Sequence, residues 1–121
     1  MLHIFFTCLF GCLSIIIGAF MAHGLEGTLS KQEIETLQLA ARYLFWNAVP
    51  LFILYVSNRE WKWPRYIIQL FIVGTCCFSG SLIIYTFSKI QWLVFITPIG
   101  GMSLIIAWVS LFFSCYQKHQ Q

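Results

Sequence analysis

The chain has 121 residues, of which 60% are hydrophobic and 9% are charged, whereas soluble domains carry about 25% charged residues. This composition excludes an ordinary soluble globule. The net charge of +3 comes from scattered basic residues, so we expect no nucleic-acid partner. Four continuous stretches without charged residues predict four transmembrane helices rather than the short alternating strands of an outer-membrane barrel. These stretches are residues 1–25, 43–58, 66–88 and 90–117.

The first predicted helix covers residues 2–22. No Lys or Arg precedes residue 31, so we expect a retained helix and not a secretory signal. Cys8 and Cys12 share a face, yet the segment holds no further ligands for a tetrahedral metal site. We interpret all five cysteines as buried small hydrophobes and expect no metal and no cofactor. A stripe of small residues favours close helix packing, and it consists of Ser14, Gly18 and Ala22.

The second predicted helix covers residues 31–57. Ser30 and Glu33 have the spacing of a capping box, in which each residue's side chain binds the other's backbone amide, so this helix begins in water. The remaining predicted helices cover residues 66–88 and 93–116.

Arg42 is the one charged residue that falls inside the membrane when the second helix is given the length needed to cross it. The charge-free part of the second helix is only about 24 Å long at 1.5 Å per residue, so residues 37–56 must form the crossing. An arginine there snorkels to the headgroups, takes a structural partner or marks a ligand site. We expect Arg42 to reach either His23 or a backbone carbonyl freed by a proline.

Four crossings place both termini and the connection between the second and third helices on the same side. That side carries more basic residues than the other, so the positive-inside rule predicts cytoplasmic termini. The sequence therefore predicts an all-α integral membrane protein, a single domain folded as an up-down bundle of four helices. The inner basic residues are Arg59, Lys62, Arg65 and Lys118, and the outer ones are Lys31 and Lys89.

Several polar residues from all four helices form a predicted cluster, most of it in the outer leaflet. Proline cannot donate a backbone hydrogen bond, so Pro98 and Pro50 each free a carbonyl and would add polarity to a pocket. A structural interpretation stays open: Ser and Thr bond to their own helix, His23 with Gly24 caps the first helix, and small residues pack the fourth. The cluster is His23, Arg42, Asn47, Ser79, Ser81, Thr97 and Pro98; the packing stripe is Gly100, Ser103 and Ala107.

Four motifs in order carry a family resemblance: Gly18-Ala19-Phe20-Met21-Ala22-His23-Gly24-Leu25; Ala41-Arg42-Tyr43 with Asn47-Ala48; Phe78-Ser79-Gly80-Ser81-Leu82; and Ile96-Thr97-Pro98-Ile99-Gly100-Gly101 followed by Trp108. With them the chain resembles the YgdD-like family of small bacterial inner-membrane proteins, a domain of unknown function whose eukaryotic relatives are called transmembrane protein 256. The resemblance covers nearly the whole chain and implies a multi-pass inner-membrane protein with no established activity. Where the family usually carries histidine this chain has Asn47, which does not titrate and so argues against a proton-carrying role here.

The sequence contains few residues that are suited to catalysis. It has no aspartate, and none of its four glutamates lies in a hydrophobic span, so we expect no enzyme. The first hypothesis is a small scaffold or accessory protein that binds membrane lipids, another membrane protein or further copies of itself. The alternative is binding or transport of a small solute or lipid at the outer-leaflet pocket.

Overall fold

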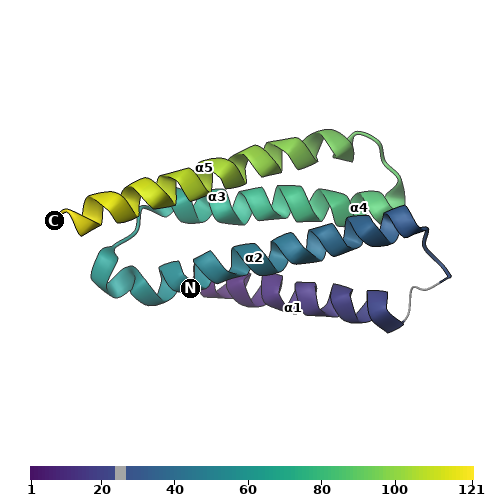
Figure 1. Cartoon of the computed structure of the whole chain (residues 1–121), viewed down its shortest axis with the longest axis horizontal. Helices are drawn as coiled ribbons and strands as arrows, with labels where there is room; N and C mark the ends of the chain where they lie inside the picture. The colour runs from purple at the N-terminus through teal and green to yellow at the C-terminus, as the bar shows by residue number, and fades with distance from the viewer. Residues whose placement is uncertain (24–26) are drawn as a thin grey trace.

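The computed structural model describes residues 1–23 and 27–121 and shows an antiparallel bundle of long helices (Figure 1). Within these residues there is no strand, and four segments are long and apolar enough to cross a membrane. The predicted fold class is therefore confirmed. The first, second and fourth crossings are α1 (Leu2–His23), α2 (Lys31–Trp61) and α5 (Leu93–His119). The third crossing joins α3 (Arg65–Thr75), the π-helical turn η1 (Cys76–Gly80) and α4 (Ser81–Ser88).

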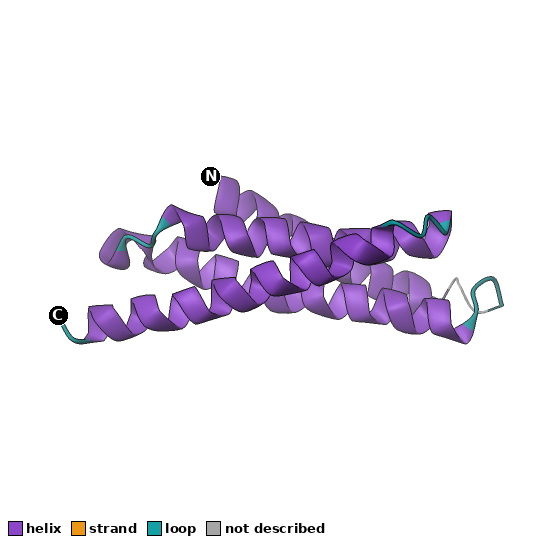
Figure 2. Cartoon of the chain, turned by 90° about the horizontal axis from the view of Figure 1, so that it is seen from above, coloured by secondary structure: helices purple, strands orange, loops and turns teal. Residues whose placement is uncertain are grey.

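The third crossing lies between α2 and α5. Helix α1 packs on α2, and α5 packs on α3, η1 and α4, so α1 and α5 form opposite edges of the bundle (Figure 1). From above, α5 runs obliquely across the helices beneath it (Figure 2). At one end of the bundle, the Lys118 ammonium near the C-terminus donates to the carbonyl of Trp61 at the end of α2. The C-terminus and the α2–α3 connection therefore lie at the same end.

Local chemistry explains where α2 begins and ends. The predicted capping box is present: the Ser30 amide donates to Glu33 Oε2 at 2.8 Å, and the Glu33 amide donates to Ser30 Oγ at 3.3 Å. The helix continues past the predicted end at residue 57, because polar residues do not stop a helix. It ends where Lys62 turns left-handed with φ of 46°, ahead of Pro64.

The core lies between α2 and the third crossing. Leu51, Leu54, Ile67 and Phe71 are fully buried there, whereas α1 buries only Phe10. The outward faces are rich in large apolar side chains, as the hydrocarbon of a bilayer requires.

The interpretation of the cysteines as buried residues was wrong for three of them. Cys8, Cys12 and Cys76 are exposed on the outside of the bundle, and Cys77 and Cys115 are half-buried. Lipid tails are as apolar as a protein core, so a small apolar side chain has no need to be inside. Gly24, the expected cap partner of His23, lies outside the described residues.

Candidate functional site

A cavity of about 490 Å³ lies between α2, η1 and α5. Asn47 is close to the middle of α2, and Ile105 is close to the middle of α5, so the cavity lies halfway along the bundle. Trp46 and Trp108 at its rim are 58% and 50% exposed, which opens it sideways toward the lipid. We call it the lateral cavity; it is lined by Tyr43, Trp46, Asn47, Phe78, Gly101, Leu104, Ile105, Trp108 and Val109.

The turn η1 supplies one wall of the lateral cavity. A π-helical turn inserts an extra residue into a helix and is frequent at functional sites. Here the turn presents Phe78, whose ring centroid lies 4.4 Å from that of Tyr43 with the planes 32° apart. On the facing helix, a Cβ at Gly101 would lie 3.7 Å from the Phe78 ring. The missing side chain of Gly101 thus leaves space in front of this aromatic wall.

Asn47 is the polar side chain buried in the lateral cavity wall. It is 3% exposed, and its Nδ2 donates to the carbonyl of Tyr43 at 2.8 Å. Its Oδ1 is buried and has no hydrogen-bond partner within the described part of the chain. Buried polar atoms are nearly always satisfied, so an open acceptor at mid-depth requires an explanation.

Two hydroxyl contacts from the predicted polar cluster join the third crossing to its neighbours. Ser79 Oγ donates to the carbonyl of Ala40 at 3.0 Å and so connects η1 to α2. Ser81 Oγ lies 2.6 Å from Thr97 Oγ1 and connects α4 to α5. Because the Ser81 hydroxyl donates to the Phe78 carbonyl at 3.0 Å, Thr97 is the donor in this pair.

The structure does not bring Arg42 and His23 into the polar cluster. Both are exposed, and the expected hydrogen bond of Arg42 to His23 or to a freed carbonyl is not present among the described residues. The neighbours Ala41 and Leu44 take the inward face of α2, which leaves Arg42 on the outward face with its long stem able to snorkel. Pro98 is exposed as well.

Thr97 and Pro98 line a separate cavity of about 390 Å³, here called the upper cavity. Neither Arg42 nor His23 is among its lining residues. The others are Thr36, Leu82, Tyr85 and Val94.

The predicted packing residues behave differently in the two stripes. Ser14 Oγ donates to the carbonyl of Ala41 at 2.8 Å, so it joins α1 to α2. A Cβ at Gly18 would meet nothing within 4 Å, and Ala22 is exposed. In α5, Gly100 and Ala107 are buried against the third crossing, while the Ser103 hydroxyl bonds to Ile99 of its own helix at 3.0 Å.

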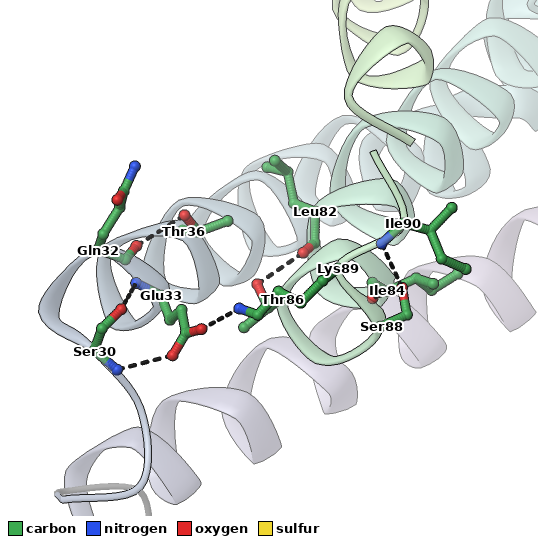
Figure 3. Close-up of polar contacts among 10 residues, drawn as sticks. All are labelled: Ser30, Gln32, Glu33, Thr36, Leu82, Ile84, Thr86, Ser88, Lys89 and Ile90. Atoms are coloured by element: carbon green, nitrogen blue, oxygen red, sulfur yellow. Dashed lines mark hydrogen bonds and ion pairs between the residues drawn. The ribbon is translucent and has the colours of Figure 1, made fainter. Parts of the chain in front are cut away.

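A polar cluster closes the end of the bundle where α2 begins and α4 ends (Figure 3). The Lys89 ammonium donates to Glu33 Oε1, and the other oxygen of this carboxylate completes the capping box with Ser30. Lys89 is the left-handed residue that caps α4, with φ of 57°. This ion pair ties the second crossing to the third at the membrane surface.

Sequence reasoning named Asn47 but missed the aromatic residues around it. Tyr43, Phe78 and Trp108 come from distant segments, and they meet where η1 packs between α2 and α5. The motifs that contain Tyr43 and Phe78 were visible in the sequence, yet a motif alone does not show which face of a helix it occupies. A residue such as Asn47 in an otherwise apolar span was the available signal.

Comparison with known proteins identifies the family of this four-helix chain. The model of the family described as "Protein of unknown function (DUF423)" matches residues 17–101. The chain belongs to this family. It is 35% identical over 109 residues to the UPF0382 membrane protein SH2409 of Staphylococcus haemolyticus, covering 87% of both chains. It is 29% identical over 113 residues to a UPF0382 membrane protein of Haemophilus influenzae, covering 93% of this chain and 91% of that one.

A relative also shows in which membrane the chain lies. Over 105 residues the chain is 30% identical to the UPF0382 inner membrane protein YgdD of Escherichia coli K12, covering 85% of this chain and 80% of YgdD. Together with the four candidate spans, this makes the chain a multi-pass protein of the bacterial inner membrane. No solved structure matches it.

Proposed function

We propose that this chain is a non-catalytic accessory protein of the inner membrane that binds a second membrane component in the lateral cavity. That component is a lipid-soluble molecule, a helix of another membrane protein or a second copy of the chain. The observation that carries the proposal is the cavity of about 490 Å³ with aromatic walls and a rim exposed at mid-depth. Binding sites for small molecules have such volumes and such walls, with a few polar groups that fix orientation.

The chemistry of the lining supports binding rather than catalysis. Among its nine described residues, the functional groups are the phenol of Tyr43, the indoles of Trp46 and Trp108, and the carboxamide of Asn47. A carboxamide neither titrates nor acts as a strong nucleophile, and a phenol can donate or accept a hydrogen bond. Such groups hold and orient a partner.

Transport at an outer-leaflet polar pocket has weaker support. The upper cavity contains Thr97 and Pro98, but neither Arg42 nor His23 contributes to its lining. An anionic solute would therefore find no cationic side chain in that lining.

The test is a pair of tryptophan substitutions in α5. Ile105 lines the lateral cavity, so Ile105→Trp narrows it, whereas Ile99 is exposed outside both cavities and Ile99→Trp is the matched control. Each protein is purified in mild detergent and analysed by native mass spectrometry. We expect the unaltered chain and the control to retain a component at constant stoichiometry that Ile105→Trp loses. A clean monomer without any bound component, or identical binding by all three proteins, would overturn the proposal.

A further inference from the structure

The hydrogen bond that the Asn47 carboxamide makes within the chain adds little to the fold, so an apolar side chain could take its place. Its hydrogen bond at 2.8 Å goes to the Tyr43 carbonyl four residues earlier, which is the carbonyl that an α-helix already pairs with the Asn47 amide. The other end of the carboxamide, Oδ1, has no partner in the described chain. Burying an unsatisfied acceptor destabilises a protein, so Asn47 is better explained by a partner from outside the chain.

A second acceptor lies beside it. Pro50 is inside α2 and has no N–H, so it cannot donate to the carbonyl of Trp46. Trp46 and Asn47 are consecutive residues of the cavity wall. Two consecutive residues of the lining thus carry an acceptor without its usual donor, Asn47 in its side chain and Trp46 in its backbone, and a matching occupant must carry hydrogen-bond donors.

The position of these acceptors restricts the occupant further. They lie near the midpoint of α2, where a bilayer contains no water to satisfy them. Phospholipid headgroups stay at the interface, and water-soluble metabolites do not enter the hydrocarbon. The donor must belong to a molecule that is itself soluble in the bilayer centre.

The aromatic walls indicate the shape of that molecule. Tyr43 and Phe78 form a tilted pair at 4.4 Å, and Trp46 and Trp108 stand at the rim. Aromatic side chains pack favourably on the face or edge of another ring. A planar ring fits such walls, and an apolar tail can leave through the open side into the lipid.

We propose that the lateral cavity binds a lipid-soluble molecule with hydroxyl groups on a planar ring, of the quinol or phenol class, whose O–H donates to Asn47 Oδ1. This inference rests on the proposed function and names the ligand class of the same cavity. Oδ1 is buried in the empty protein, so binding requires the carboxamide to rotate, which the broad χ2 energy well of asparagine allows.

The test compares two probes that differ in the O–H donor. The chain in nanodiscs of phosphatidylethanolamine and phosphatidylglycerol is titrated with a decyl benzoquinol, kept reduced, or with its bis-methyl ether. Binding is followed by quenching of tryptophan fluorescence, since Trp46 and Trp108 line the cavity. We expect saturable quenching by the quinol and about tenfold weaker binding of the ether, because the ether leaves the acceptor unpaired. Equal binding of the two probes, or unsaturable quenching by both, would overturn the inference.

Two variants separate ligand binding from a structural role. Asn47→Leu keeps the branched shape of the side chain and removes its polar atoms, and the control Gln69→Leu also replaces a carboxamide, at an exposed site on α3. We expect Asn47→Leu to remove the preference for the quinol and to raise the melting temperature of the empty protein, because the unpaired acceptor is gone. The control should bind like the unaltered chain. A lower melting temperature together with unchanged quinol binding would assign Asn47 a structural role and reject the inference.

The two proposals fail in different ways. If Ile105→Trp loses a bound component while quinol and ether bind alike, the accessory function stands and the ligand class is wrong. If the component proves to be a partner helix, that result also rejects the quinol class. If no component is bound and the quinol does not quench, both proposals are rejected.

Discussion

Gly100 of α5 packs directly on the backbone of Phe78 in η1. A Cβ built on Gly100 would lie 2.4 Å from the Phe78 nitrogen, 2.9 Å from the carbonyl carbon of Cys77 and 2.9 Å from the Gly74 oxygen. These atoms belong to the backbone and cannot move aside as a flexible side chain would. Close approach of backbones supplies the van der Waals contact that holds membrane helices together, since lipid gives no hydrophobic drive for it.

We therefore expect Gly100→Ala to lower the free energy of unfolding by about 1–3 kcal/mol, the usual cost of overpacking. Thermal unfolding followed by circular dichroism in detergent would measure it. Gly18→Ala is the matched control, because a Cβ there meets nothing within 4 Å. Equal melting temperatures for the two variants would show that the Gly100 contact is not tight.

Ser79→Ala should also destabilise the bundle. The Ser79 hydroxyl is fully buried and donates to the Ala40 carbonyl across the interface between η1 and α2. Hydrogen bonds between membrane helices contribute about 0.6 kcal/mol on average and at most about 1.7 kcal/mol, so we expect a loss in this range. Ser103→Ala is the control, since that hydroxyl bonds to its own helix. A loss no greater than that of the control would contradict the prediction; unfolding in detergent measures both.

The helices could be predicted from the sequence because their determinants are local. The length of each charge-free stretch and the capping box of Ser30 and Glu33 are both readable along the chain. The turn η1 could not be predicted, because Cys76–Gly80 contains no residue that interrupts a helix decisively. The turn makes its contacts with distant segments, those of Ser79 with Ala40 and of Phe78 with Gly100, which no local pattern encodes.

The candidate site likewise combines features that the local sequence predicts with features that depend on distant contacts. Asn47 could be recognised as unusual because it is polar within an apolar span. Its relation to Phe78 and Trp108 depends on how three crossings meet, which no local pattern encodes. The length of the charge-free stretch predicts a depth for Arg42 in the membrane, but it does not predict the outward face of α2 that Arg42 occupies.

Arg42→Ala should leave the stability of the isolated protein nearly unchanged. The side chain is exposed and has no hydrogen bond or ion pair among the described residues, so we expect a change of about 0.5 kcal/mol or less, as for other surface substitutions. Leu44→Ala, at a buried position two residues away, should cost about 2–5 kcal/mol in the same unfolding assay. A large loss for Arg42→Ala would show that Arg42 has a structural partner.

The orientation of the bundle can be tested with reporters at its two ends. If the termini are cytoplasmic, green fluorescent protein fused after Gln121 will fluoresce, and alkaline phosphatase at the same site will be inactive. The expected cause is the excess of Arg59, Lys62, Arg65 and Lys118 on that side. Arg59→Gln combined with Arg65→Gln removes the excess and should give mixed orientation, so both reporters become partly active. The control Glu60→Gln should change neither reporter, because acidic residues contribute little to this rule. An active phosphatase at the C-terminus of the unaltered chain would show that the orientation is the opposite of the predicted one.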